Sequence, residues 1–248
     1  MTTFHFENAQ FDYEPYPVCY VPDFMDAEVY RGLQESYPPL ELFQYKQYLG
    51  DKYSLGEKGH YKQYVDFLKK NEAWSEFHRT IKSRKFVEDL IELAHQRHID
   101  LGIKEFDFVK GRKVNTRNLW QRARNRRAIR SRFEFSIMRA NGGHILPHAD
   151  APQKLITLVL SFIGKNEWKP AWGGGTDVVL PKDRNRIYNH MNKQLPFSEV
   201  DHIKTFPFNE NQAVMFIKTY NSWHSVTPMT GPESGLRKTV TINIEEII

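Results

Sequence analysis

The strongest constraint on the fold is a change of hydrophobic period near Arg132. From there to the C-terminus, short segments rich in β-branched and aromatic residues alternate with Gly, Pro and Asn turns, and no segment of helical period separates them. The segments are residues 132–140, 154–163, 175–180, 211–220, 224–229 and 237–247. Successive strands without intervening helices do not form a βαβ sheet, so we expect an antiparallel sandwich or barrel.

The first part of the chain has a helical pattern instead. Residues 71–81 and 83–98 carry apolar residues at helical spacing, and each segment begins with a favourable capping residue, Asn71 or Ser83. Another helix is expected to begin at Asp23.

These patterns predict a mainly β protein with N-terminal helices, in the α+β class. A chain of 248 residues is long enough to bury a large core as a single domain, residues 1–248. We expect a helical support region, residues 1–110, to pack on a jelly-roll catalytic core, residues 132–248.

The stretch from Asn141 to Phe162 carries the main chemical signal, because His148 and Asp150 lie two positions apart at the edge of a predicted strand. In an extended chain, residues two apart point to the same side. An imidazole nitrogen and a carboxylate oxygen together suit a divalent ion of intermediate hardness. The spacing therefore predicts two ligands of one metal site.

A third ligand has to come from another strand, and His224 opens a late one. Two histidines and one carboxylate on one face of an ion leave three octahedral positions open, as in non-haem Fe(II) oxygenases. A cosubstrate oxoacid with a distant carboxylate would also need a buried cation. Arg237 suits that role because its guanidinium can donate two parallel bonds, and Thr239 follows on the same strand face.

Four sequence features together resemble the prolyl-4-hydroxylase-like branch of the Fe(II)/2-oxoglutarate dioxygenases. They are His148-Ala149-Asp150, then "WGGGTDVVLP", then "NSWHSVTPMTG", and finally Arg237-Lys238-Thr239. The similarity covers about residues 133–244, and "VPDFMDAEVYRGL" resembles the family's opening helix.

The resemblance implies a double-stranded β-helix with Fe(II) at His148, Asp150 and His224 as the catalytic centre. It implies 2-oxoglutarate at Arg237, and O2 as oxidant, with ascorbate as an additional reductant. The expected reaction is hydroxylation with release of succinate and CO2. Halogenating relatives replace the carboxylate ligand by a small residue, so the presence of Asp150 favours hydroxylation.

One position departs from the family pattern. Relatives often carry a 2-oxoglutarate-binding tyrosine nine residues before the first ligand histidine, where this chain has Arg139. Either one cosubstrate contact is missing or Arg139 meets an anionic substrate. Asn221 and Trp223 flank the second histidine and are the other candidate substrate residues, although a buried tryptophan more often belongs to the core. We interpret His144 as a structural residue of a turn.

A basic stretch between Arg112 and Arg132 contains nine Lys or Arg residues and no acid, so it accounts for the net charge of +5. A solvated loop, a site for an anionic substrate, and a nucleic-acid contact are three readings of it. The substrate can be a small molecule or a peptidyl group, with a slight preference for an acidic one. The alternatives to a hydroxylase are a non-catalytic jelly-roll module that binds a metal or ligand, and a nucleic-acid demethylase.

A cytoplasmic location is expected, because the N-terminus lacks a signal-peptide pattern and the chain has a single cysteine. No apolar run reaches the length that crosses a membrane, so no membrane partner is expected.

Overall fold

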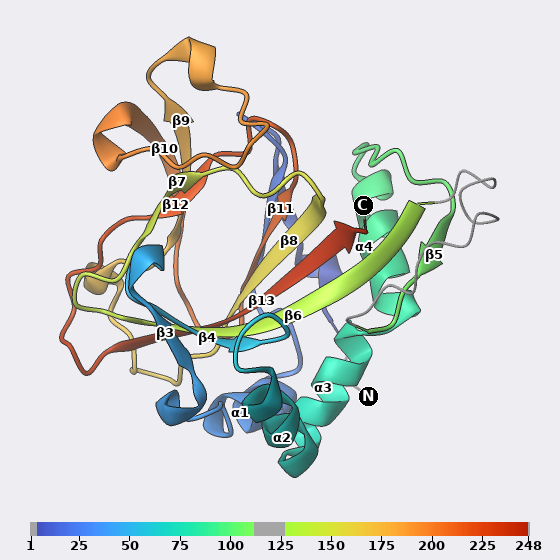
Figure 1. Ribbon diagram of the computed structural model, residues 1–248, viewed down its shortest axis with the longest axis vertical. Helices are drawn as coiled ribbons and strands as arrows, with labels where there is room; N and C mark the ends of the chain where they lie inside the picture. Colours follow the sequence, from blue (N-terminus) through green and yellow to red (C-terminus); the bar gives the residue numbers. More distant parts are fainter. Residues whose placement is uncertain (1–3, 112–126, 248) are drawn as a thin grey trace.

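The computed structural model describes residues 4–111 and 127–247 (Figure 1). The helices are α1 (Ala27–Glu35), α2 (Tyr61–Lys70), α3 (Glu72–Ile81) and α4 (Arg84–Gln96). The strands are β1 (Gln10–Asp12), β2 (Val18–Val21), β3 (Gln44–Lys46), β4 (Lys52–Gly56), β5 (Phe106–Phe108), β6 (Arg127–Arg139), β7 (Ile145–His148), β8 (Lys154–Ser161), β9 (Thr176–Pro181), β10 (Val200–Phe206), β11 (Ala213–Ile217), β12 (His224–Val226) and β13 (Leu236–Glu246). The expected mainly β fold with N-terminal helices is confirmed.

The described strands form two sheets. The larger has the order β1-β2-β11-β8-β13-β6-β4-β3, with β5 pairing in parallel at β6, and the smaller has the order β10-β9-β12-β7. All other pairings are antiparallel. Neighbouring strands are mostly distant in sequence, as expected for a jelly roll, so residues from separate motifs are brought side by side.

Alternation along the strands separates an apolar face from a polar interior. On β13, Val240, Ile242 and Ile244 belong to the core cluster that includes the helices, whereas Arg237 and Thr239 line a cavity between the sheets. The same period of two applies to β8 and β11. The polar functional positions are therefore on the opposite side of the sheet from the helical layer.

The helices cover the outer face of the larger sheet (Figure 1). Aromatic side chains fill the contact: the Trp74 and Phe135 ring centroids are 4.7 Å apart, and Trp74 also packs against Phe77 and Phe162. This apolar layer gives the sheet a rigid backing, so that the cavity on the other face has a fixed wall.

Two of the three expected helix starts are confirmed. The Asn71 side chain accepts a hydrogen bond from the Trp74 amide at 3.0 Å, and the Ser83 side chain accepts one from the Phe86 amide at 3.1 Å. The expectation at Asp23 is wrong. The helix α1 begins at Ala27, and Asp23 has a left-handed backbone with φ of 44°.

The N-terminal region also contributes strands that the sequence patterns did not predict. Residues 44–56 form the hairpin of β3 and β4, which extends the larger sheet beside β6. In the part of the chain that the structure describes, no helix is long and apolar enough to cross a membrane.

Candidate metal centre

The two candidate histidines lie directly opposite each other in the smaller sheet. His224 on β12 pairs with His148 on β7, and their ring centroids are 4.4 Å apart. Asp150 follows β7 by two residues, so its side chain returns to the same side as that of His148. One ligand atom from each of the three residues lies within 4.8 Å of the others. The three predicted side chains therefore lie together. Among the described residues, they are the one group of three or more His, Cys, Asp or Glu side chains whose ligand atoms are this close to one another.

Both imidazoles have one ring nitrogen fixed by the backbone. His148 Nδ1 lies 2.8 Å from the Leu146 carbonyl oxygen, and His224 Nδ1 lies 3.0 Å from the Ser222 carbonyl oxygen. A carbonyl accepts a hydrogen bond, so each Nδ1 carries the proton and each Nε2 keeps its lone pair. This is the tautomer required of a metal-binding imidazole.

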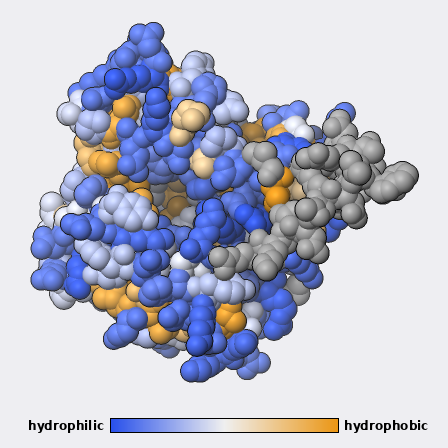
Figure 2. Space-filling view, viewed as in Figure 1, coloured by the Kyte–Doolittle hydropathy of each residue, from blue (hydrophilic) through white to orange (hydrophobic). Residues whose placement is uncertain are grey.

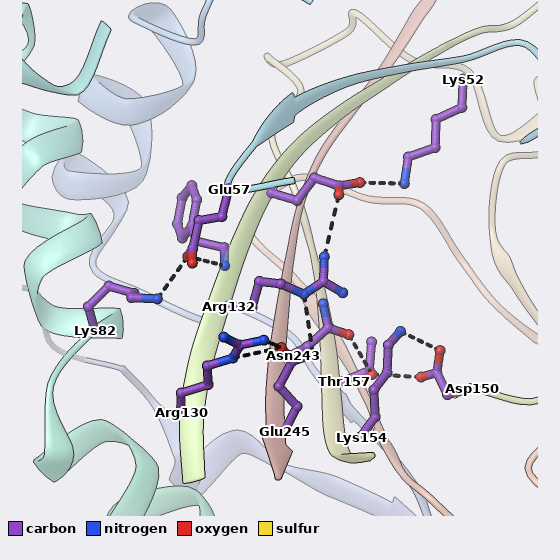
Figure 3. A network of polar contacts seen from close by, with 12 residues as sticks. Lys52, Glu57, Lys82, Arg130, Arg132, Asp150, Lys154, Thr157, Asn243 and Glu245 are labelled. Carbon is purple, nitrogen blue, oxygen red and sulfur yellow. Dashed lines mark hydrogen bonds and ion pairs between the residues drawn. The ribbon is translucent and has the colours of Figure 1, made fainter. Parts of the chain in front are cut away.

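The Asp150 carboxylate is held by two side chains (Figure 3). Lys154 Nζ lies 2.5 Å from Oδ1, and Thr157 Oγ1 lies 2.6 Å from Oδ2. Thr157 in turn contacts Asn243 Oδ1 on β13 at 3.1 Å. These contacts fix the orientation of the carboxylate toward the histidines.

Electrostatics keep the three groups in ligand-competent forms. Burial lowers the pKa of His148 to about 3, and nearby His224 adds to that shift. Burial likewise lowers the pKa of His224. For Asp150, burial opposes ionisation, but the Lys154 ammonium outweighs it and holds the pKa well below its usual range. Neutral imidazoles and an ionised carboxylate are therefore present at neutral pH.

A cavity of about 440 Å³ contains the triad. Its wall near the metal ligands includes apolar residues, with Phe216 stacked on the His224 ring at 4.4 Å between centroids. Its mouth is more polar and includes Gln47, Tyr48, Asn192 and Gln194. Figure 2 shows a hollow near the centre of the molecule, surrounded mainly by hydrophilic residues. A small molecule or an extended side chain fits a cavity of this size.

Arg237 is the buried cation of this cavity. Its side chain lies on the interior face of β13, its Nε donates to the Gly174 carbonyl at 2.6 Å, and its guanidinium lies 4.6 Å from the centre of the Phe208 ring. Within the described residues, no carboxylate forms an ion pair with it. Burial lowers its pKa to about 10, so it remains charged at neutral pH. A buried, unpaired guanidinium is suited to an incoming carboxylate.

Thr239 shares the face of Arg237 and lines the same cavity. Its Oγ1 lies 3.4 Å from the Ser136 carbonyl oxygen. Because this hydrogen bond is long, the hydroxyl can also accept a hydrogen bond from a ligand, or rotate and donate one to it.

The Gly173-Gly174-Gly175 turn serves close packing. Gly174 has a positive φ of 82°, and a Cβ there would lie 2.8 Å from the Trp168 ring. The absent side chain lets the Gly174 carbonyl reach Arg237. The turn leads into β9.

The structure does not bring the three weaker substrate candidates to the cavity. Arg139 lies at the end of β6, where its Nη1 contacts the Glu233 carbonyl at 3.3 Å and its carboxylate at 3.7 Å. The Asn221 amide donates to the Pro15 carbonyl at 3.0 Å. Trp223 is 2% exposed and donates to the Ile187 carbonyl at 2.7 Å. All three side chains lie outside the cavity wall, and each donates to a backbone carbonyl of another segment.

His144 lines the cavity mouth but is not part of the triad. Its Nδ1 contacts the Gly142 carbonyl oxygen at 2.9 Å within the turn, which agrees with a structural role.

Most of the basic stretch, residues 112–126, lies outside the described residues. Of its remaining members, Arg127 pairs with Glu246 at 2.7 Å, and Arg130 pairs with Glu245 at 2.6 Å. Arg132 lies 3.3 Å from the same Glu245 carboxylate (Figure 3). Arg130 and Arg132 therefore share one carboxylate across β6 and β13, Arg127 forms a separate ion pair beside them, and the three side chains are not a free basic surface.

Sequence reasoning missed Lys154 and Thr157, which hold Asp150. A lysine four residues after the acid and a threonine seven residues after it have no distinctive spacing. The two contacts with Asp150 become evident only from the structure, in which β8 places Lys154 and Thr157 beside this carboxylate.

The donor set fits a divalent iron ion. Two neutral imidazoles and one carboxylate on one side of the site form the two-histidine, one-carboxylate arrangement of non-haem iron oxygenases. The unpaired Arg237 in the same cavity fits the distal carboxylate of an oxoacid.

No protein-family model and no curated protein matches the sequence. Solved structures do match in fold. A prolyl 4-hydroxylase from Pseudomonas putida is 13% identical, with a TM-score of 0.50 over 95% of this chain and 96% of that one. The non-haem α-ketoglutarate-dependent epimerase SnoN from nogalamycin biosynthesis is 12% identical, with a TM-score of 0.52 over 92% of this chain and 76% of that one. The chain is thus structurally similar to 2-oxoglutarate/Fe(II) oxygenases over most of its length, which confirms the expected double-stranded β-helix.

Proposed function

We propose that the protein is an Fe(II)- and 2-oxoglutarate-dependent dioxygenase that hydroxylates its substrate. The observation that carries the proposal is that the triad of His148, Asp150 and His224 shares one cavity with the buried, unpaired Arg237. A metal-binding module without catalysis has no need for that second cation.

His148 and His224 would hold the metal through Nε2, and Asp150 would hold it through a carboxylate oxygen. With these three ligands, the metal would keep further positions for the cosubstrate and O2. When bound, Fe(II) and 2-oxoglutarate supply the oxidising chemistry, with one oxygen atom of O2 entering succinate and the other entering the substrate. The Phe216 ring and the other apolar wall residues exclude water from the metal ligands.

Arg237 would receive the distal carboxylate of 2-oxoglutarate through its Nη groups, since its Nε is already bonded to the Gly174 carbonyl. Thr239, on the same strand face, is placed to add a hydroxyl contact. These two side chains orient the cosubstrate and fix its keto-acid end toward the triad.

Hydroxylation is the proposed reaction type because this chain has a carboxylate ligand, Asp150, at the position where halogenating relatives have a small residue. Epimerisation is the second candidate, and the fold similarity to a 2-oxoglutarate-dependent epimerase motivates it. Product analysis separates the two, since only hydroxylation adds the mass of one oxygen atom to the substrate.

The test is succinate release by the purified protein with Fe(II), 2-oxoglutarate and O2. Wild type is expected to form succinate slowly without a substrate and faster with an accepted one. His148→Ala and Asp150→Ala are expected to form none and to lose metal affinity in calorimetry with Mn²⁺. A protein that binds metal tightly but forms no succinate with any substrate class would be a non-catalytic module.

We also propose a small-molecule or peptidyl substrate, and a screen of both classes by succinate release tests this. Nucleic-acid demethylation is the weaker alternative, and binding of an oligonucleotide at low salt tests it. Stimulation by ascorbate and a cytoplasmic location also remain predictions.

A further inference from the structure

The mouth of the cavity that contains the triad carries polar and aromatic side chains that no other described residue engages. Gln47, Asn192 and Gln194 line it with exposed side chains, and no hydrogen bond joins their amide groups to the rest of the described chain. Tyr48 also lines it, is 78% exposed, and its ring stacks on no other aromatic ring of the described residues. The mouth therefore offers three free carboxamides and one free aromatic face to a ligand.

The turn that carries Gln47 and Tyr48 has a fixed backbone. The amides of Gly50 and Asp51 donate to the Gln47 carbonyl at 3.2 and 3.3 Å, and the Gly50 carbonyl accepts from the His144 amide at 3.3 Å. Gly50 has a φ of 73°, and a Cβ there would collide with the His144 carbonyl oxygen. This close contact holds the turn against the chain that leads into β7, so its side chains stay at the mouth.

The segment that carries Asn192 and Gln194 is also fixed by hydrogen bonds. The Asn189 side chain donates to the Lys193 carbonyl at 2.7 Å and accepts from the Lys193 amide at 2.9 Å, which closes a turn around Asn192. Gln194 then forms a backbone bridge with His148. The free amide of Gln194 is therefore attached directly beside a candidate metal ligand.

The charged side chains at the mouth already have partners. Lys52 pairs with Glu134 at 2.7 Å, and the Asp51 carboxylate accepts from the Tyr45 hydroxyl. The groups that remain free for a ligand are thus neutral. An uncharged polar ligand suits this part of the cavity better than the acidic one that the sequence favoured.

An added peptide strand does not suit this part of the cavity. β7 is an edge strand of the smaller sheet, but the His144 amide before it is bonded to the Gly50 carbonyl. The Pro147 carbonyl near its end accepts from the Leu195 amide at 2.9 Å. Both ends of the edge are therefore occupied, and a peptide cannot pair along it by β-strand addition.

Sugars have the chemistry that these free groups match. A carboxamide has one acceptor and two donors in one plane, so it can accept from one hydroxyl and donate to a neighbouring one. A tyrosine ring offers a flat apolar surface, against which the C–H face of a sugar ring can lie. A few placed polar groups around an apolar contact are typical of sites that bind small molecules.

We propose that Gln47, Tyr48, Asn192 and Gln194 recognise an uncharged, polyhydroxylated substrate, such as a sugar unit of a small glycoside. This inference rests on the proposed oxygenase function and names the substrate class for it. Because Gln194 bridges to His148, a sugar that bonds to its amide would lie beside the metal ligands.

The test uses the Mn²⁺-loaded protein saturated with 2-oxoglutarate, which fills the cosubstrate position without turnover. The probes are methyl glucoside, methyl galactoside, maltose and sucrose at millimolar concentration, with an uncharged proline-containing peptide for comparison. Saturation-transfer NMR measures binding and affinity. Gln194→Leu removes one amide at similar size, and Tyr48→Ala removes the ring. The matched controls are Gln63→Leu, at an exposed glutamine of α2, and Tyr188→Ala, at a tyrosine that is 68% exposed and outside the cavity wall.

At least one of the four saccharides is expected to bind wild type and both control variants. Gln194→Leu and Tyr48→Ala should each bind it about three- to tenfold more weakly, because one neutral hydrogen-bonding group or one ring contact is lost. The affinities for Mn²⁺ and 2-oxoglutarate should not change in any variant.

Three results would overturn the proposal: no saccharide binds wild type, the peptide binds and no saccharide does, or Gln194→Leu and Tyr48→Ala bind the saccharide as tightly as wild type. Failure of the oxygenase function itself would be seen separately, because wild type would then not bind Mn²⁺ or 2-oxoglutarate, or would release no succinate with Fe(II).

Discussion

His148 and His224 face each other across one pair of antiparallel strands, with their ring centroids 4.4 Å apart, although 75 residues separate them in the chain. The register of β7 and β12 alone sets this distance, and the backbone carbonyls of Leu146 and Ser222 set the direction of the two rings. The arrangement of the candidate metal site is therefore set by sheet geometry.

Thr157 is expected to support metal binding without touching the metal. Its hydroxyl donates to Asp150 at 2.6 Å, and Thr157→Val removes that bond with little change in shape. Metal affinity should fall about 10-fold, as is typical when a ligand loses a supporting hydrogen bond. Calorimetry with Mn²⁺ measures it.

Thr241→Val is the matched control for this change, because Thr241 also lines the cavity but is not bonded to Asp150. Equal affinities in the two variants would show that the Thr157 bond has no role in the metal site.

Arg237 is expected to determine affinity for 2-oxoglutarate and not for the metal. Arg237→Gln removes the charge, and 2-oxoglutarate should bind about 10–100-fold more weakly because a charge-assisted pair is lost. Arg237→Lys keeps the charge but not the fork, so an intermediate affinity is expected. Titration of the Mn²⁺-loaded protein gives both constants, and an unchanged dissociation constant for 2-oxoglutarate in Arg237→Gln would refute the assigned role.

The sequence predicted the site residues where a chemically suitable residue also had a clear position in the strand alternation. His148 and Asp150 could be paired because residues two positions apart in an extended chain point to the same side. Arg237 could be assigned because its strand places it on the interior face. The helix starts at Asn71 and Ser83 followed from local hydrogen bonds, which depend only on neighbouring residues.

Contacts set by long-range register were beyond that reasoning. Thr157 is an ordinary threonine in the sequence, and its position beside Asn243, from which it bonds to Asp150, depends on β8 pairing with β13. Trp223 precedes the candidate ligand His224, and Arg139 lies at the end of β6. Their side chains nevertheless donate to the carbonyls of Ile187 and Glu233, outside the cavity wall.

Glu245 is expected to be the main stabilising member of the network on β6 and β13. Its carboxylate is 1% exposed and lies between Arg130, at 2.6 Å, and Arg132, at 3.3 Å. Glu245→Gln would remove the charged acceptor that two partly buried guanidinium groups share, although Arg132 keeps a longer contact with Glu134 at 3.6 Å. The free energy of unfolding should therefore fall by about 3 kcal/mol. Denaturant unfolding at neutral pH measures this difference.

The neighbouring pair supplies the comparison. Glu246 pairs with Arg127 at 2.7 Å, but the two side chains are 22% and 30% exposed. Glu246→Gln should cost about 1 kcal/mol or less, because solvent screens the pair. If the two variants were equally stable, burial of the Glu245 pair would not be the source of its contribution.

His78 is expected to make the fold sensitive to acid. Burial, with a smaller effect of Lys82, lowers the pKa of His78 to about 4, and its Nε2 has no hydrogen-bond partner among the described residues. An unfolded histidine titrates near 6.5, so between these values the unfolded chain binds more protons than the folded one. Stability is therefore complete above about pH 6.5 and falls as the pH drops through 4.

His78→Phe is expected to remove this dependence, because the ring already packs edge-on against Tyr64 and Phe133 at 5.7 and 5.3 Å between centroids. Between pH 7 and pH 4 the variant should lose about 3 kcal/mol less unfolding free energy than wild type. His95→Phe, at an exposed position on α4, should follow the wild-type curve. Urea unfolding at several pH values provides the measurement, and parallel curves for wild type and His78→Phe would mean that His78 is protonated in the folded protein as easily as in the unfolded chain.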